Sequence, residues 1–280
     1  MHIADELIDL ALKEDIGLGD ITTENLIAAD SMGSAVIVAK EDLTICGFDV
    51  AKRVFQRLDP GIKYTPYFED GVDITTGQTV LAIEGNLTAL LSGERTALNF
   101  LQRLSGIATL TRSYLKFTQN TKVKLVDTRK TTPGLRALEK YAVRMGGGSN
   151  HRTGLYDGVL IKDNHIAACG GIREAVTLIR SKISHLIKVE VETASLAQVK
   201  EALIAGADVI MLDNMDPDQI RKAVAVINAQ ALVEVSGGVT TDNLAQLVET
   251  GVDLISIGAL THSARAVDLS MRIRSKPVLN

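Results

Sequence analysis

The amino-acid sequence predicts an α/β fold, in which a smaller unit of helices and short strands precedes a barrel-like parallel sheet. In the second half of the chain, β-branched runs begin at Leu186, Asp208, Leu232 and Asp253, which are 22, 24 and 21 residues apart, and helical patterns separate them. Such compact βα repetition forces parallel strands with right-handed crossovers. No Gly-x-Gly-x-x-Gly fingerprint follows the first run of this region, 123–126. Its absence disfavours a doubly wound dinucleotide fold.

The composition is that of a globular protein of one large or two smaller domains. The chain has 280 residues, of which 46% are apolar and 23% charged, so it can bury a sizeable core. Its apolar runs stay short of the ~20 residues that span a bilayer, and the acidic, amphipathic start 1–6 is unlike a signal peptide. The two cysteines, Cys46 and Cys169, fit neither a disulfide framework nor a metal cluster, and we expect both to be small buried residues. We therefore expect a cytoplasmic protein with no membrane partner.

Basic residues are concentrated in one stretch of an acidic chain. Residues 122–165 contain nine Lys or Arg and four acids, a net charge of +5, whereas the whole chain carries −4. Like charges held together destabilise a fold unless a ligand neutralises them, so the stretch predicts small anionic ligands. Nucleic acid is a poor second candidate, because the chain is acidic and only 4% aromatic.

The first third of the chain predicts one short helix, three strands and one long helix. Apolar residues at helical spacing predict a helix over 4–12, and a second, longer helix is expected over 88–105. Strands are expected at 35–39, 62–68 and 79–84, with turns at Gly71 and Gly77 between the last two.

Glu94 and Arg95 interrupt the apolar stripe of the long helix. One interpretation is a buried or interfacial ion pair; the other is a charge presented into a site across an interface. The pattern alone favours the ion pair.

Six strands and four helices are expected after Gly106. The strands are 123–126, 158–161, 186–191, 208–212, 232–235 and 253–257, and the helices are 172–180, 196–205, 217–227 and 241–250.

In βα barrels the chemistry lies at the carboxyl ends of the strands. Cations end the first two strands, acids the next two, and small residues the last two. In chain order these ends are Asp127-Thr128-Arg129-Lys130, Lys162-Asp163-Asn164-His165, Glu190-Val191-Glu192, Asp213-Asn214, Ser236-Gly237-Gly238 and Gly258-Ala259.

The small residues predict a phosphate site. Ser236-Gly237-Gly238 and Gly258 leave backbone N–H groups unobstructed, and Thr240 to Asp242 look like the cap of the following helix, whose N-terminus favours an anion. The alternative is that these glycines only relieve tight turns.

The charged strand ends leave several roles open. Glu192 and Asp213 are candidate ligands of Mg²⁺ or of sugar hydroxyls, or else caps of the following helices. Glu190 has the parity of Glu192, so one of the two could be structural. Lys162 could form a Schiff base, as in aldolases. His151 and His165 could be acids, bases or structural residues, and their spacing does not suggest zinc.

Taken together, these segments resemble quinolinate phosphoribosyltransferase, also called nicotinate-nucleotide pyrophosphorylase (carboxylating), of the type II phosphoribosyltransferases. The resemblance covers nearly the whole chain in order. The segments that carry it are ERTALN (94–99), DTRKTTPG (127–134), GGG (146–148), NHR (150–152), LIKDNHI (160–166), MLDNM (211–215), EVSGG (234–238) and GALTHS (258–263).

The resemblance implies a reaction, a fold and an assembly. The reaction converts quinolinate and phosphoribosyl pyrophosphate to nicotinate mononucleotide, pyrophosphate and CO₂ with Mg²⁺, in de novo NAD synthesis. The fold has an N-terminal α/β sandwich domain, here 1–108 with the tail 270–280 on it, and a seven-stranded incomplete TIM-like (β/α) barrel, here 109–269. The assembly is a homodimer or a hexamer, a trimer of dimers, with Arg95 donated across the interface.

The resemblance also assigns roles to the strand-end residues. Lys130, Lys162, Glu192 and Asp213 are implied to be catalytic, and Glu192 and Asp213 to hold the metal. Arg129, His151, Arg152 and Lys162, with Arg95 of the neighbour, are implied to bind quinolinate, and Lys130 the diphosphate. The full set implied to bind substrate is Arg95, Thr128, Arg129, Lys130, His151, Arg152, Lys162, Glu192, Asp213, Ser236, Gly237, Gly238 and Gly258.

Three other functions stay open at this point. They are a non-catalytic phosphate-binding barrel, a molybdenum-transport-associated paralogue, and a Schiff-base aldolase acting through Lys162. None of them accounts for the whole set of segments.

Overall fold

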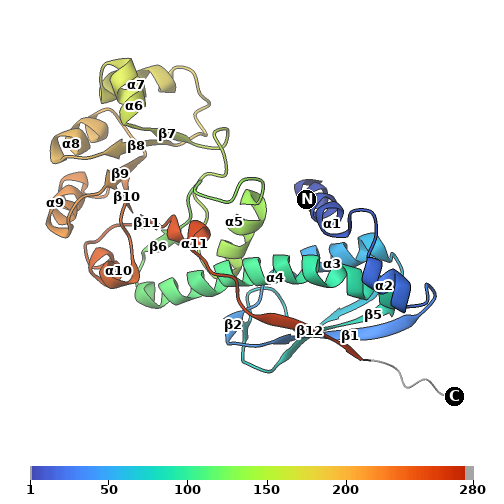
Figure 1. Cartoon of the computed structure of the whole chain (residues 1–280). Coiled ribbons are helices and arrows are strands. Elements are labelled where there is room, and N and C mark those ends of the chain that lie inside the picture. Colours follow the sequence, from blue (N-terminus) through green and yellow to red (C-terminus); the bar gives the residue numbers. More distant parts are fainter. Residues whose placement is uncertain (1, 275–280) are drawn as a thin grey trace. The chain divides into compact units, whose positions relative to one another are not determined.

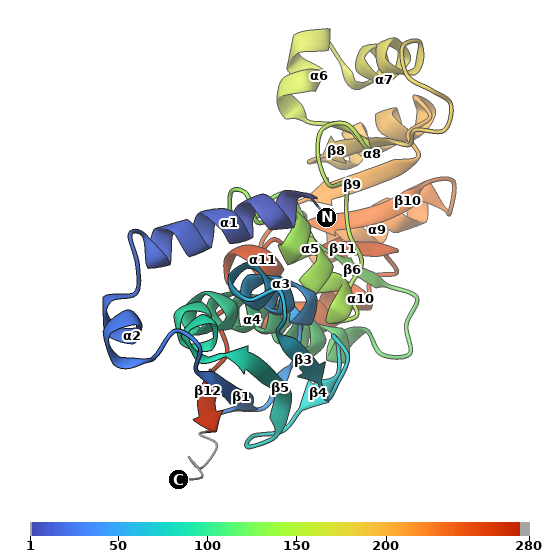
Figure 2. The ribbon, with the colours of Figure 1, turned by 90° about the vertical axis from the view of Figure 1, so that its right-hand side faces the viewer.

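The computed structural model describes residues 2–274 and forms two compact units. The first unit contains residues 1–112, 132–147 and 260–280 as far as they are described, and the second contains 113–131 and 148–259. Figures 1 and 2 show the chain from two sides. Each unit is described by itself.

The first unit is built on a four-stranded antiparallel sheet in the order β12-β1-β5-β3. α3 and α4 lie on one face of this sheet (Figure 2). The last strand of the chain joins this sheet through its pairing with β1, whereas residues 275–280 lie outside the described part. The strands are β1 (Met32–Ala39), β3 (Lys63–Pro66), β5 (Thr79–Asn86) and β12 (Leu269–Arg274), and a separate pair is formed by β2 (Leu43–Thr44) and β4 (Asp73–Ile74).

The helices of this unit differ in part from the prediction. The first helix is longer than expected, and four helices were not predicted at all. Two of them are only six and four residues long, whereas the other two have an apolar face at helical spacing that the prediction overlooked. The helices are α1 (His2–Ile16), α2 (Ile21–Leu26), α3 (Phe48–Leu58), α4 (Leu87–Leu115), α5 (Arg136–Met145) and α11 (Ala259–His262).

The predicted end of the long helix at residue 105 was wrong, since α4 continues to Leu115. Gly106 does not stop the helix. A Cβ at Gly106 would overlap the backbone carbonyl of Arg265, so the glycine permits a close approach of the 264–266 segment. A helix tolerates glycine at a cost of about 1 kcal/mol when packing requires it.

The second unit is a six-stranded parallel sheet in the order β6-β11-β10-β9-β8-β7. The first strand lies next to the last, as expected when a βα series curls into a barrel. The opening lies between β7 and β6, where one parallel bridge joins Val126 to Ser149. The described sheet therefore has six strands and one bridge rather than the seven strands implied by resemblance. The strands are β6 (Lys124–Val126), β7 (Val159–Ile161), β8 (Val189–Thr193), β9 (Val209–Asp213), β10 (Leu232–Ser236) and β11 (Leu254–Ser256).

Helices cover the outer side of this sheet, as the arc of α7 to α10 in Figure 1 shows. α7 and α9 have the predicted bounds, and α8 and α10 end one and two residues earlier than predicted. The elements are η1 (Lys116–Thr118), α6 (Asp163–Cys169), α7 (Ile172–Arg180), α8 (Leu196–Ile204), α9 (Pro217–Ile227) and α10 (Thr241–Val248). Within residues 2–274, every helix is too short or too polar to cross a lipid bilayer.

Candidate active site

The carboxyl ends of the parallel strands surround a pocket of about 490 Å³, a volume suited to small-molecule ligands. Eleven of the thirteen predicted substrate-binding residues line it. Gly258 is not among the described lining residues, and Arg95 lies in the first unit. The lining residues are Thr128, Arg129, Lys130, His151, Arg152, Leu160, Lys162, Glu192, Met211, Asp213, Asn214, Glu234, Ser236, Gly237, Gly238 and Ser256.

Four cationic side chains line the pocket: Arg129, Lys130, Arg152 and Lys162. The turn after β6 is held by the backbone N–H of Lys130, which donates to Thr128 Oγ1 over 3.0 Å. Burial lowers the pKa of Arg152, and the nearby charge of Arg129 lowers it further. Both effects disfavour the charged form of Arg152, and an anionic ligand beside its guanidinium would favour that form again.

Lys162 forms an ion pair with Glu192. Lys162 follows β7, and Glu192 lies on the neighbouring strand β8. A Schiff-base lysine must attack as a neutral amine in a desolvated site. The Lys162 side chain is 44% exposed and its ammonium contacts a carboxylate, so the surroundings favour ion pairing over nucleophilic attack.

Glu192 and Asp213 are not helix caps. The helices that follow them, α8 and α9, are capped by Ser195 and Asp216 instead. Both acids line the pocket from adjacent strands, β8 and β9. Asp213 Oδ2 accepts a hydrogen bond from Asn214 Nδ2 at 2.9 Å. Both carboxylates therefore face the pocket rather than a helix terminus, Glu192 beside Lys162 and Asp213 beside Asn214.

The Ser236-Gly237-Gly238 turn requires its glycines. Gly237 has φ = +95° and Gly238 has φ = +58°, a region that favours glycine. A Cβ on Gly237 would also overlap the side-chain amide of Asn214. Thr240 is the N-cap of α10, as predicted. The turn therefore brings a bare backbone and a helix N-terminus to one side of the pocket, an arrangement suited to phosphate.

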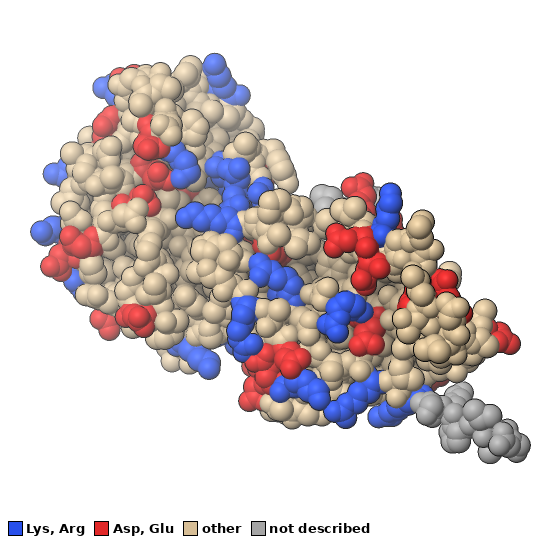
Figure 3. All heavy atoms as spheres, viewed as in Figure 1, with Lys and Arg blue, Asp and Glu red and all other residues tan. Residues whose placement is uncertain are grey.

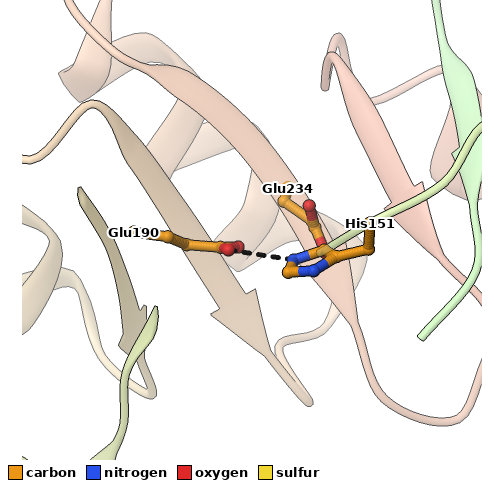
Figure 4. Close-up of side chains that lie close together, drawn as sticks. All are labelled: His151, Glu190 and Glu234. Carbon is orange, nitrogen blue, oxygen red and sulfur yellow. Dashed lines mark hydrogen bonds and ion pairs between the residues drawn. The ribbon is translucent and has the colours of Figure 1, made fainter. Parts of the chain in front are cut away.

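A buried cluster of His151, Glu190 and Glu234 lies at the pocket (Figure 4). His151 Nε2 lies 2.9 Å from Glu190 Oε2 and 3.7 Å from Glu234 Oε1. The sequence left open which of Glu190 and Glu192, on the same face of one strand, belongs to the site. Glu192 lines the pocket, whereas Glu190 contacts His151. Burial and the charge of Glu190 raise the pKa of Glu234 to about 7, although His151 and a hydrogen bond from Ser256 oppose the rise.

Three functional candidates were missed by the sequence reasoning. Glu234 was quoted only as part of a segment, yet it alternates with Ser236 on β10 and therefore shares its face. Asp127 is fully buried and accepts the backbone N–H of His151 at 2.9 Å. Asn214 has φ = +53°, which residue type alone could not reveal. The signal for the first two was a charged residue inside an apolar strand or directly at its end.

One of the two cysteine predictions was wrong. Cys46 is buried and unpaired, as expected, but Cys169 is exposed at the end of α6. α6 has no buried residue, so the apolar neighbours of Cys169 in sequence did not indicate burial.

Arg95 is exposed on α4, and Glu94 beside it is half-buried. Burial raises the pKa of Glu94, and the charge of Arg95 opposes the rise. The exposure of Arg95 excludes a fully buried ion pair within one chain.

The charged surface is mixed. On the face drawn in Figure 3, Lys and Arg side chains lie beside Asp and Glu side chains rather than forming a uniformly basic area.

Comparison with known proteins gives consistent results. Residues 20–105 match the family model of the quinolinate phosphoribosyl transferase N-terminal domain, and residues 107–272 match that of the C-terminal domain. The probable nicotinate-nucleotide pyrophosphorylase (carboxylating) of Bacillus subtilis is 46% identical over 268 residues, covering 96% of this chain and 92% of its own. A mitochondrial quinolinate phosphoribosyltransferase (decarboxylating) of Nicotiana tabacum is 40% identical, with 98% and 83% covered.

Solved structures agree with these matches. The crystal structure of NadC from Streptococcus pyogenes is 41% identical, has a TM-score of 0.93, and covers 96% of this chain and 95% of its own. The nicotinate-nucleotide pyrophosphorylase from Francisella tularensis is also 41% identical, with a TM-score of 0.94 and coverages of 98% and 96%. Sequence and fold thus agree over nearly the whole length, and the chain belongs to the quinolinate phosphoribosyltransferase family.

Proposed function

We propose that this protein converts quinolinate and phosphoribosyl pyrophosphate to nicotinate mononucleotide, pyrophosphate and CO₂, a step of de novo NAD synthesis. One observation carries the proposal: a single pocket collects four cations, three acidic side chains (Glu192, Asp213 and Glu234) and a bare Ser-Gly-Gly turn at the ends of parallel strands. These are the groups that a dicarboxylate and a phosphorylated sugar would need. The names of the relatives supply the specific reaction.

Quinolinate is proposed to bind among the guanidinium and ammonium groups. Its two adjacent carboxylates need several fixed cations, and Arg supplies bidentate geometry. Arg129, Arg152 and Lys162 supply these charges, with Arg95 from a second subunit. Thr128 and His151 complete the walls of this part of the pocket.

Phosphoribosyl pyrophosphate is proposed to bind along the remaining strand ends. The 5′-phosphate would accept hydrogen bonds from the backbone N–H groups of Ser236, Gly237 and Gly238. Gly258, at the end of the next strand, would add a further backbone N–H. Lys130 would bind the diphosphate as a point charge. Glu192 and Asp213 would accept hydrogen bonds from the ribose hydroxyls.

The same two acids fit a Mg²⁺ site. Magnesium is usually held by one or two carboxylates together with substrate phosphates, and Glu192 and Asp213 line the pocket from adjacent strands. Bound there, Mg²⁺ would neutralise charge on the diphosphate leaving group.

The protein's own residues would act by position and charge rather than as nucleophiles. Lys130 would stabilise the charge that grows on the departing pyrophosphate, while the carboxylates of Glu192 and Asp213 would favour positive charge at the anomeric carbon. Arg129 and Arg152 would align the pyridine nitrogen with that carbon. The resulting pyridinium would stabilise the electron pair left on the ring carbon when the adjacent carboxylate departs as CO₂, and that carbon would then take up a proton from solvent to give nicotinate mononucleotide.

A homodimer or a hexamer built from dimers is proposed, with Arg95 completing the site of a neighbour. Arg95 and Ile21 line one hollow of about 330 Å³ in the first unit. Ile21, Leu18 and Leu26 in this part of the chain are 81%, 110% and 75% exposed. Exposed large apolar side chains of this kind favour an interface between subunits. A cytoplasmic location is also proposed, and two unpaired cysteines support it.

The experiment is a turnover assay with quinolinate, phosphoribosyl pyrophosphate and Mg²⁺, with nicotinate as the control substrate. We expect equimolar pyrophosphate, CO₂ and nicotinate mononucleotide from quinolinate alone. Lys162→Ala should lose at least about 100-fold in kcat/KM while remaining folded, because a cation beside the reacting carboxylates is removed. Binding of both substrates without turnover would instead support the non-catalytic barrel.

A further inference from the structure

Two acidic side chains lie beside His151 at the pocket, and the proposed reaction does not use them. Glu190 on β8 and Glu234 on β10 flank the ring of His151 (Figure 4). Only 9% of the Glu190 side chain and 1% of the Glu234 side chain are exposed. Two acids buried this deeply are costly unless their contacts compensate. What they contact therefore indicates why they are there.

Both nitrogens of His151 are engaged. The backbone N–H of Arg152 donates to His151 Nδ1 over 2.7 Å, so Nδ1 carries no proton and the proton resides on Nε2. Nε2 then donates to Glu190 Oε2 at 2.9 Å. From the other side, buried Asp127 accepts the backbone N–H of His151. The ring cannot rotate without losing hydrogen bonds on both edges.

The same contacts argue against a metal ion in the cluster. His151, Glu190 and Glu234 lie close enough together to ligate one. A metal would need the lone pair of Nε2, which is protonated in this arrangement. The hydrogen bonds hold His151 and Glu190 without an ion, whereas Oε1 of Glu190 and Oε1 of Glu234 are buried with no hydrogen-bond partner among the described residues.

The restraint on His151 is passed on to Arg152. The backbone of Arg152 is fixed by the histidine ring, and its guanidinium Nη1 donates to the carbonyl of Gly158 at 3.0 Å. The negative charge of Glu190 also favours the cationic form of Arg152, against the repulsion from Arg129. A guanidinium that has to meet a planar carboxylate depends on such fixed orientation.

We infer that Glu190 is a positioning residue: it fixes the ring of His151, with Glu234 on the other side of the ring, and the ring in turn fixes the backbone of Arg152. The guanidinium of Arg152 is thereby oriented to bind a carboxylate of quinolinate. This inference rests on the proposed function, because it assumes that Arg152 binds quinolinate. Glu190 itself does not line the pocket and touches no reacting atom.

Glu190→Leu and Glu190→Gln form a matched pair for the test. Leucine has no acceptor for the Nε2–H of His151, whereas the amide oxygen of glutamine can still accept it. Calorimetry should show that Glu190→Leu weakens quinolinate binding about tenfold, while Glu190→Gln stays within about threefold of wild type. The KM for phosphoribosyl pyrophosphate should change less than about twofold in both, because its groups lie elsewhere.

A double-mutant cycle with Arg152→Ala tests the route of the effect. If Glu190 acts through the Arg152 side chain, Glu190→Leu should change quinolinate affinity less than about twofold once that side chain is gone. If Glu190→Leu does not fold, Glu190→Met takes its place in the cycle, because methionine keeps the length of the side chain and lacks an oxygen that could accept from the Nε2–H of His151.

The outcomes separate the inference from the proposed function. Additive losses in the cycle, or equal losses for both substrates in the single variant, would overturn the inference alone. Wild-type quinolinate affinity in Arg152→Ala would overturn the proposed place of quinolinate, and the inference with it.

Discussion

Glu234 shows how the barrel interior treats a charged group. It lies on β10 among apolar residues, and its side chain is 1% exposed. Burial and the neighbouring Glu190 raise its pKa from an ordinary 4.5 to about 7. Between these two values the folded protein binds more protons than the unfolded chain, so the free energy of unfolding falls as pH rises.

We expect this effect in the pH dependence of stability. Glutamine is neutral at every pH. Glu234→Gln therefore does not lose the free energy of unfolding that the wild type loses when Glu234 ionises. The melting temperature of the variant relative to wild type should rise between pH 5 and pH 8, by an amount equivalent to at most on the order of 3 kcal/mol. Thermal scans across this range measure it, with exposed Glu249→Gln as the control. Parallel curves for Glu234→Gln and wild type would contradict the assignment.

Residue types at the strand ends could be predicted, but their partners could not. Parallel strands end at one edge of a sheet, so Lys162, Glu192 and Asp213 could be assigned to one site from the sequence. The ion pair of Lys162 with Glu192 depends on side-chain rotamers across two strands. The overlap that a side chain on Gly237 would make with Asn214 depends on the path of two loops. Neither is encoded in a local pattern.

At the scale of elements, amphipathic helices and buried strands of the βα series were predicted well. α7 and α9 have the expected bounds because a clear period of 3.6 coincides with end signals, such as Asp216 and Pro217 at the start of α9. α6 was missed because it is seven residues long and has no buried face. α4 was predicted too short, since it passes Gly106 and continues to Leu115.

Gly106 gives a prediction at this scale. Alanine is the better helix former by about 1 kcal/mol, yet its Cβ would overlap the Arg265 carbonyl, which is backbone and cannot turn away. Gly106→Ala should therefore destabilise the first unit by about 2 kcal/mol net and lower the melting temperature by roughly 5 °C. Asn99→Ala, at an exposed position of the same helix, should cause no loss. A stabilised Gly106→Ala variant would show that the close approach does not exist in solution.

At the scale of the whole molecule, strand order is what distinguishes a curled sheet from a doubly wound one. β6 pairs with β11, the last strand of the series, and this closure could be expected from βα repetition without a nucleotide fingerprint. The tail from 270 was expected on the first unit by resemblance, and its described part pairs with β1. The association of residues 132–147 and 260–269 with this unit could not be predicted, because contacts between distant segments leave no local period. Quaternary structure is still less accessible to local patterns, since the only hint within one chain is exposed apolar surface.

The proposed sharing of Arg95 between subunits gives the last prediction. Arg95→Ala and Lys162→Ala should each abolish activity when pure, because both sites of the proposed homodimer would then lack one essential cation. If Arg95 serves a neighbour's site, a heterodimer of the two variants places both changes in one site and leaves the other intact. Co-refolding equal amounts should therefore restore activity to about a quarter of the wild-type level, since half of randomly paired dimers are mixed.

The same mixture discriminates against an Arg95 that serves its own chain. In that case the heterodimer would carry one defect in each site, and mixing would restore nothing. A mixture of Lys162→Ala with Arg129→Ala is the matched control, because both residues line the pocket of the second unit and cannot complement each other. Recovery of activity only in the Arg95 mixture would thus establish that the active site requires two chains. If neither mixture regained activity, Arg95 would belong to the site of its own subunit or to no site.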